Sequence, residues 1–451
     1  MLMKMSRTVP AVLALVLLSG AGGLHTAKAQ NDGLGRTPVL GWSSWSFLRE
    51  HPTAAKVEAE ARALKHSGLQ KLGYEYVNLD DFWYECPGKQ GPSVNRYGLW
   101  VTDASRFPAH GKTNGIKALA EYVHSLGMKF GMYVTPGISK QAVRKNTPIE
   151  GTPYTADEIA EPSRRESNYN CGGMVAINFQ KPGAQQYINS WADRFARWGV
   201  DFVKLDGIRN RNVPDIEAWS KAIRQSGRPM ILNVTGDRFT PAIAPMLMKF
   251  AGLWDFLSDI ECYRCEKHGS SYPLTDWQDV EKRFNAVAQW RPYAGPGGFN
   301  NYDSIEVGNG GNDGLTPAER QTQLSLWALG ASPIILGVDL THLNRRDLRY
   351  LKNTAVLWVD QDSIAAARVL DTARRQVFAK VEPDGDAIVG LFNTSTQSEE
   401  ISIPASRVGL PARNGGYWAT NLWTGKVGRQ DGTISATVPS HGVALYRVRA
   451  H

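Results

Sequence analysis

Signatures of several common catalytic centres are missing from this sequence of 451 residues. It has no Gly-x-Ser-x-Gly motif, which exposes a nucleophilic serine, and no His-Glu-x-x-His helix, which binds zinc. No glycine-rich loop that would hold phosphate groups precedes a helix. No cluster of lysine and arginine accompanies the formal net charge of +8, so we expect no nucleic-acid partner.

Long hydrophobic runs are also scarce, and the one that stands out lies at the start of the chain. Lys4 and Arg7 precede an apolar run from Val9 to Leu18, and Ala27-Lys28-Ala29 then resembles a small-x-small cleavage site. This pattern predicts a signal peptide over residues 1–29. The run is too short to span a bilayer. We therefore expect an exported protein, periplasmic or extracellular, with no membrane association after signal cleavage.

Cysteine is rare, with four residues in the chain, Cys86, Cys171, Cys262 and Cys265. An even number in an oxidising compartment favours disulfides, and four cysteines allow three pairings among which the sequence does not choose. The Cys262-Tyr-Arg-Cys265 spacing also suits a redox motif or half of a zinc site. No second cysteine or histidine pair has zinc spacing, so we expect no metal.

From Arg36 onward, short apolar runs alternate with helical patterns, which is typical of repeated βα units. One helical stripe, formed by Ile188, Trp191 and Phe195, ends at Gly199. The sequence predicts a (β/α)₈ TIM barrel over residues 30–361. Its expected strands are Val39–Trp42, Tyr74–Asp80, Lys129–Thr135, Asp201–Asp206, Met230–Val234, Leu253–Ser258, Arg291–Ala294 and Ile334–Val338.

Two regions depart from the βα pattern. After about Asp362 the chain consists of short alternating strands with turn residues between them, which predicts a C-terminal antiparallel β-sandwich over residues 362–451. This domain carries no obvious catalytic grouping, so we interpret it as a stabilising module. The loop Glu150–Cys171 is long and polar for a compact barrel, which indicates a functional or a mobile segment.

The carboxyl ends of barrel strands build the active site whichever reaction the barrel catalyses. Lys204 and Asp206 are two residues apart on one strand and therefore point the same way. A neighbouring cation lowers the pKa of a carboxyl group, so we expect Asp206 to be an ionised nucleophile. The alternative is an ordinary surface ion pair. The predicted strand ends also supply Trp45, Asp80, Asp81, Tyr133, Asp259 and Asp303.

Acidic residues dominate these strand ends. The 14 tryptophans of the chain also suggest sugar binding, because flat aromatic faces suit sugar rings, although burial in the core is the commoner role of tryptophan. Two facing carboxyl groups, one ionised and one protonated, are the equipment of a glycoside hydrolase acting on a carbohydrate. Asp206 suits the ionised role. Asp259 suits the protonated one because it follows an apolar segment, although Asp255 competes with it. The adjacent Asp80 and Asp81 are either sugar ligands or turn caps.

Six segments occur in an order that resembles a known family, glycoside hydrolase family 27, which holds α-galactosidases and α-N-acetylgalactosaminidases. Leu422-Trp-Thr-Gly425 and His441-Gly-Val-Ala-Leu445 resemble its C-terminal β-domain. The six segments are Arg36-Thr-Pro-Val-Leu-Gly-Trp-Ser-Ser-Trp45, Asn78-Leu-Asp-Asp-Phe-Trp83, Gly131-Met-Tyr133, Lys204-Leu-Asp-Gly207, Ser258-Asp-Ile260 and Gly295-Pro-Gly-Gly-Phe-Asn-Asn-Tyr-Asp303.

The resemblance implies a retaining hydrolase that releases terminal α-linked galactose by double displacement. It places Asp206 at the nucleophile position and Asp259, rather than Asp255, at the acid/base position. It implies that no metal or organic cofactor takes part. The residues that it places around the terminal sugar are Trp45, Asp80, Asp81, Tyr133 and Lys204.

The sequence departs from the family where substrate choice is decided. Asp255 follows Trp254 at a position where the family commonly has arginine, so Arg264 or Arg209 would have to supply that contact to the sugar. The segment Asn300–Asp303 also differs from the family's Asn-Asp-Pro-Asp. An isomaltose-releasing dextranase, an α-N-acetylgalactosaminidase and a β-L-arabinopyranosidase therefore remain alternatives, as does a sugar-binding barrel without catalytic activity.

Overall fold

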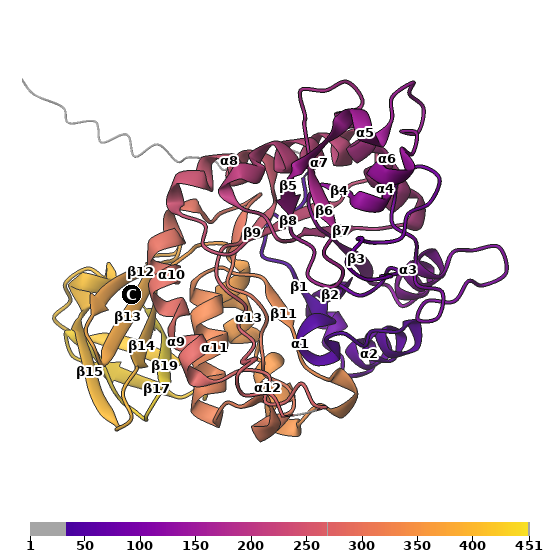
Figure 1. Ribbon diagram of the computed structural model, residues 1–451. Coiled ribbons are helices and arrows are strands. Elements are labelled where there is room, and N and C mark those ends of the chain that lie inside the picture. The colour runs from indigo at the N-terminus through magenta and orange to yellow at the C-terminus, as the bar shows by residue number, and fades with distance from the viewer. Residues whose placement is uncertain (1–32, 268, 450–451) are drawn as a thin grey trace, which may run out of the picture.

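The computed structural model describes residues 33–267 and 269–449, which form a barrel followed by a β-sandwich (Figure 1). The predicted signal peptide lies outside the described residues. Within them, no helix has both the length and the apolar character needed to cross a membrane.

Eight parallel strands form the barrel, in the order β10-β9-β8-β7-β3-β2-β1-β11. The sheet closes just beyond β10, where the Ile305 amide donates to the Ile335 carbonyl and the Gly337 amide donates to the Ile305 carbonyl. This architecture confirms the predicted α/β barrel. The strands are β1 Leu40–Ser43, β2 Tyr74–Leu79, β3 Lys129–Val134, β7 Phe202–Leu205, β8 Ile231–Thr235, β9 Leu253–Asp255, β10 Phe299–Asn301 and β11 Ile334–Leu336.

Helices cover the outside of the barrel, and helices such as α6 (Ala184–Trp198) bury one apolar face. In this helix Trp191 and Phe195 are buried and pack against Trp219 of the next helix, and Gly199 ends the helix in the left-handed conformation that glycine adopts without strain. The larger helices are α2 Ala54–His66, α3 Gly115–Ser125, α6 Ala184–Trp198, α7 Val213–Gln225, α8 Ala244–Phe250, α10 Arg283–Trp290, α11 Pro317–Leu329, α12 Arg345–Leu351 and α13 Thr354–Gln361. The shorter ones are α1 Trp45–Leu48, α4 Lys140–Lys145, α5 Ala156–Ile159 and α9 Trp277–Glu281.

One strand prediction is wrong. The segment Arg291–Ala294 is not a strand, because Arg291–Tyr293 forms a turn of 3₁₀-helix with Pro292 in its first turn. The strand of this unit is β10, whose Asn300 is fully buried. Its side chain accepts a hydrogen bond from Trp254 Nε1 at 2.7 Å and donates to the Trp290 carbonyl at 2.8 Å. These partners allow a polar residue to occupy a buried strand.

The long polar loop predicted between Glu150 and Cys171 has structure of its own. It contains α5 and β5 Ala160–Glu166, and β5 pairs with β6 Met174–Ile177, which also pairs with β4 Ile138–Ser139. A disulfide between Cys86 and Cys171 ties the end of this segment to the loop that follows β2. The segment thereby reaches the carboxyl end of β7, where Ser167 and Tyr169 lie beside Gly207.

The C-terminal domain is a sandwich of two antiparallel sheets, as predicted. Val377, Val389, Ile401 and Ile434 are buried between the sheets. On the other face of the larger sheet, Phe378 and Phe392 share a core with the barrel. The domain boundary at residue 362 stays a prediction. The larger sheet holds β12 Ala367–Asp371, β13 Arg375–Val381, β14 Ala387–Asn393, β19 Val443–Arg449, β16 Tyr417–Asn421 and β17 Val427–Gln430, and the smaller one β15 Glu399–Pro404 and β18 Thr433–Val438.

Candidate active site

A cavity of about 560 Å³ lies at the carboxyl ends of the strands and gathers most of the predicted site residues. Its size is in the range of small-molecule sites. Asp255 and Asp303 do not line it. The cavity is lined by Trp45, Asp80, Asp81, Tyr133, Tyr169, Lys204, Asp206, Asp237, Ser258, Asp259, Glu261, Tyr263, Arg264, Asp279 and Lys282.

Asp80 and Asp81 both reach the cavity although they are adjacent in sequence. The backbone turns at the end of β2, and Phe82 has a φ of 69°, which lies in the left-handed region. The Asp81 amide donates to Asp80 Oδ1 at 2.9 Å, and the Phe82 amide donates to Asp81 Oδ1 at 2.7 Å. Each carboxylate is therefore fixed through one oxygen by the turn itself.

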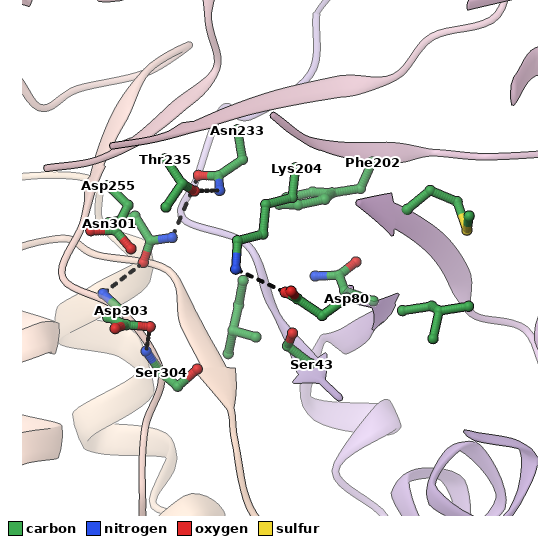
Figure 2. Close-up of a pocket in the computed structure, with 14 residues that line it drawn as sticks. Ser43, Asp80, Phe202, Lys204, Asn233, Thr235, Asp255, Asn301, Asp303 and Ser304 are labelled. Carbon is green, nitrogen blue, oxygen red and sulfur yellow. Dashed lines mark hydrogen bonds and ion pairs between the residues drawn. The ribbon is translucent and has the colours of Figure 1, made fainter. Parts of the chain in front are cut away.

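Lys204 extends from β7 toward Asp80, and its Nζ lies 2.8 Å from Asp80 Oδ2 (Figure 2). Burial lowers the pKa of Lys204, but the charges of Asp80 and Asp206 outweigh burial and hold that pKa well above its ordinary value. The lysine is thus charged and paired with the Asp80 carboxylate, which follows β2, two strands along the sheet from β7.

Asp206 follows β7 and is held by two backbone contacts. Its amide donates to the Val134 carbonyl at 2.9 Å, and its Oδ1 accepts from the Gly207 amide at 2.6 Å. Gly207 has a φ of +72°, and a Cβ at this position would lie 2.6 Å from the Ser167 Cβ. Glycine is required here on both grounds.

The expectation of a lowered pKa for Asp206 is wrong. Burial, together with the charges of Asp80 and Asp259, raises the pKa of Asp206 to about 7. Lys204 lowers this pKa, but by less than these effects raise it. The lysine is bonded to Asp80, so its effect on Asp206 is that of a nearby charge alone.

Asp259 lies at the mouth of the same cavity, on the segment that follows β9. It remains accessible to solvent, yet the surrounding protein and the charge of Asp303 raise its pKa. The Tyr263 hydroxyl donates a hydrogen bond to Asp259 Oδ2. One carboxylate oxygen from each of Asp259, Glu261 and Asp303 lies within 4.8 Å of the others, so repulsion within this group favours protonation.

Asp255 and Asp303 line a second, smaller cavity of about 40 Å³ beneath the first (Figure 2). Asp303 Oδ2 accepts from the Ile260 amide at 2.7 Å and so anchors the segment that carries Asp259. Burial and the charge of Asp303 raise the pKa of Asp255 well above its ordinary value, which favours a neutral carboxyl group. Both residues are placed to support the larger cavity from below rather than to line it.

Arg264 lines the larger cavity, but its guanidinium is bonded to acidic side chains. It lies 2.5 Å from Asp276 and 2.9 Å from Asp279, and about half of its side chain is exposed. Arg209 is not among the lining residues. Of the two arginines considered for the missing sugar contact, only Arg264 is near enough to the cavity to make one.

Sequence reasoning missed several cavity residues, of which Tyr169 and Tyr263 are the largest. Tyr169 is 59% exposed and comes from the polar segment before Cys171, and Tyr263 lies between Cys262 and Cys265. The disulfides that place both tyrosines could not be chosen from sequence. The Tyr133 hydroxyl, which was predicted, is buried and lacks a hydrogen-bond partner in the described part of the chain.

Two family models match the chain. One, described as alpha galactosidase A, matches residues 37–148 and 166–362. The other, described as the alpha galactosidase C-terminal beta sandwich domain, matches residues 372–448. The first model covers most of the barrel, and the gap in its match, residues 149–165, contains α5 and nearly all of β5.

Individual relatives agree with the family models. The α-galactosidase of Oryza sativa subsp. japonica is 29% identical over 425 residues, covering 93% of this chain and 86% of that protein. The α-galactosidase of Cyamopsis tetragonoloba is 30% identical over 422 residues, covering 92% and 87%. A crystal structure of a GH27 β-L-arabinopyranosidase from Geobacillus stearothermophilus has a TM-score of 0.82 at 27% identity, covering 92% of this chain and 96% of the other. The chain therefore belongs to glycoside hydrolase family 27, the α-galactosidase family, and is a glycoside hydrolase.

Proposed function

We propose that the protein is a retaining, exo-acting hydrolase that releases terminal α-linked galactose, with Asp206 as nucleophile and Asp259 as acid/base. The observation that carries the proposal is that these two carboxyl groups, from the segments that follow β7 and β9, line one cavity together with Asp80, Asp81 and Lys204. Carboxyl groups at such a site perform both steps of glycoside hydrolysis.

In the first step, an Asp206 oxygen attacks the anomeric carbon while Asp259 gives its proton to the departing glycosidic oxygen. Since Asp206 Oδ1 accepts from the Gly207 amide, Oδ2 is the oxygen left for attack. The new bond joins Asp206 to the sugar, and the bond to the leaving group breaks. In the second step Asp259, now ionised, takes a proton from water, which displaces Asp206 and releases the sugar.

The remaining polar groups of the cavity are suited to the hydroxyls of one sugar. Asp80 and Asp81 accept hydrogen bonds, Lys204 donates them, and the unpartnered Tyr133 hydroxyl can do either. Lys204 and Asp80 can both bind sugar hydroxyls while their ion pair keeps the two charges balanced. Trp45 adds a flat apolar face.

Galactose is supported as the released sugar by the relatives, which are α-galactosidases at 29% and 30% identity. A second candidate is β-L-arabinopyranose, because the β-L-arabinopyranosidase structure has a TM-score of 0.82 with this chain. The two sugars share ring stereochemistry and differ by the hydroxymethyl group of galactose. Discrimination therefore depends on the space available for that one group.

The function is tested with a panel of 4-nitrophenyl glycosides: α-galactoside, α-N-acetylgalactosaminide and β-L-arabinopyranoside, with dextran assayed separately for release of isomaltose. We expect the highest kcat/KM on the α-galactoside. Asp206→Ala should abolish turnover while leaving the fold intact, and Asp193→Ala, which removes a carboxylate from the outer helix α6, should leave turnover unchanged. A wild-type protein that binds sugars but cleaves none of these substrates would instead support a non-catalytic sugar-binding barrel.

We also propose that the protein is exported. The two disulfides support an oxidising compartment, since such bonds are rare where thiols are kept reduced. The test is mass spectrometry of the protein recovered from its native host. A mature chain that begins at Gln30 is expected, and a chain that retains residues 1–29 would contradict the proposal.

A further inference from the structure

We propose that Tyr263 is a positioning residue for the acid/base, holding Asp259 through its hydroxyl, and that the Cys262–Cys265 disulfide keeps it in place. The proposal rests on the function proposed above for Asp259. It concerns a residue that lies outside the predicted site and that acts through Asp259 rather than on the sugar.

The direction of the hydrogen bonds at Tyr263 is fixed by the chemistry of its neighbours. Trp45 Nε1 lies 2.8 Å from the Tyr263 hydroxyl oxygen, and an indole nitrogen can only donate. The hydroxyl oxygen therefore accepts from Trp45. Its single proton is free to point at Asp259 Oδ2, which is its other partner. The two hydrogen bonds that link Trp45, Tyr263 and Asp259 therefore direct the tyrosine proton to Oδ2 of the acid/base.

The ring of Tyr263 is held although 46% of the residue is exposed. The Arg49 guanidinium lies 4.9 Å from the ring centroid. Arg49 in turn lies 2.7 Å from a Glu266 oxygen and 3.6 Å from a Glu261 oxygen. This stacking fixes the plane of the ring independently of the hydroxyl group.

The backbone that carries Tyr263 is a closed loop. The disulfide joins Cys262 to Cys265, and the Cys265 amide donates to the Cys262 carbonyl at 2.7 Å. Cys262 is itself buried, and its amide donates to the Leu274 carbonyl at 2.9 Å. A short cross-linked loop has few conformations available, so Tyr263 is presented to Asp259 before any substrate binds.

This geometry has two consequences for catalysis. Because Tyr263 donates to Oδ2, the proton that Asp259 transfers is left on Oδ1. After the transfer, the same hydrogen bond stabilises the carboxylate. It thereby lowers the pKa of Asp259 against the opposing effects of the surrounding protein and of the Asp303 charge. Tyr263 therefore makes Asp259 a stronger acid than its surroundings alone would allow.

The test is Tyr263→Phe, which keeps the ring and its contact with Arg49 but removes the hydroxyl. We expect the alkaline limb of the kcat/KM profile to move to higher pH by about one unit, since Asp259 then keeps its proton longer. At neutral pH, kcat/KM should fall about tenfold for a substrate with a poor leaving group. It should change less than about twofold for a 2,4-dinitrophenyl glycoside, which needs little proton assistance.

A matched control is available in Tyr122, on α3 away from the cavity. Its hydroxyl accepts from Arg62 Nη1 at 2.8 Å, and the same arginine lies 5.8 Å from the ring centroid. Tyr122→Phe removes a comparable contact and should leave the pH profile unchanged. The paired variant Cys262→Ser/Cys265→Ser should reproduce part of the Tyr263→Phe shift. A shift in Tyr263→Phe without one in the paired variant would overturn the part assigned to the disulfide.

The outcomes separate this inference from the proposed function. Wild-type turnover together with an unshifted Tyr263→Phe profile overturns the inference alone. If the wild type cleaves no glycoside, the proposed function fails, and the hydrogen bond is tested without turnover. Carbon-13 NMR of labelled aspartate carboxyls, with Asp259→Asn assigning the signal, should then show Asp259 titrating at higher pH in Tyr263→Phe. An unchanged titration would overturn the inference.

Discussion

Lys204 Nζ lies 2.8 Å from Asp80 Oδ2, although Lys204 shares its strand with Asp206. The lysine is therefore the direct partner of the carboxylate that follows β2, which is separated from β7 by β3, and acts on Asp206 only as a nearby charge. Substrate binding and nucleophile ionisation are linked through this one ammonium group. Its removal should affect both, and the two effects have different kinetic signatures.

Lys204→Met is expected to raise KM by about tenfold or more, because it leaves the buried Asp80 without its ion-pair partner. It should also raise the pKa of Asp206, since Lys204 lowers that pKa. The acidic limb of the kcat/KM profile then moves to higher pH. The measurement is the full pH profile of both kinetic constants. A change in KM with an unmoved acidic limb would contradict the second effect.

The pKa of Asp206, raised to about 7, predicts the pH dependence of the wild-type enzyme. A nucleophile must be ionised, so kcat/KM should decline as the pH falls below about 7. The decline should approach a tenfold loss per pH unit. Initial rates between pH 4 and 9 on an aryl glycoside provide the measurement. A kcat/KM that stays constant down to pH 5 would show that the pKa of Asp206 is not raised and would contradict this prediction.

The same raised pKa predicts an effect on stability. In the folded state Asp206 keeps its proton up to about pH 7, whereas in the unfolded chain it loses the proton near its ordinary pKa of 3.8. The contribution of Asp206 to the free energy of unfolding is therefore fully present below pH 3.8 and is lost as the pH rises from 3.8 to about 7. Asp206→Asn should raise the melting temperature at pH 8 by about 2–4 °C and have little effect at pH 4. A gain at pH 4 equal to that at pH 8 would argue against a titrating Asp206.

Gly207 links backbone conformation to the position of the nucleophile. A Cβ here would lie 2.6 Å from the Ser167 Cβ, and the residue has a φ of +72°. Gly207→Ala should cost about 1 kcal/mol in backbone strain and more from the clash, and should lower kcat by displacing Asp206. Gly227 has the same φ of +72° with no atom within 4 Å of an added Cβ. Gly227→Ala therefore measures the strain alone, and equal losses of activity in both variants would refute the role of the clash.

Much of the fold follows from local patterns in the sequence. A strand such as β7 leaves a signal because Phe202, Val203 and Leu205 are buried and lie together between a helix stop and a loop. The strand β10 left none, because its Asn300 is stabilised by Trp254 and Trp290, which are distant in sequence. Pro292 lies where the strand was expected, and it starts a 3₁₀ turn instead.

The candidate site was predictable to the extent that it depends on strand ends. Asp80, Lys204 and Asp206 were placed from their positions after apolar runs, and the structure brings them to one cavity. The depth of Asp255 was not predictable, because it depends on how the barrel closes beneath the site. Tyr263 was missed because its place depends on a disulfide, and sequence spacing does not choose among cysteine pairings.

The central claim, that Asp206 attacks the sugar and Asp259 assists, is tested most directly by trapping the covalent intermediate. The enzyme is incubated with a fluorinated galactosyl fluoride, which slows the second step, and is then digested and analysed by mass spectrometry. The account predicts one sugar adduct, on the peptide that contains Asp206, with release of the product in the retained α configuration. An adduct on a different carboxylate, or no adduct together with a product of inverted configuration, would contradict it.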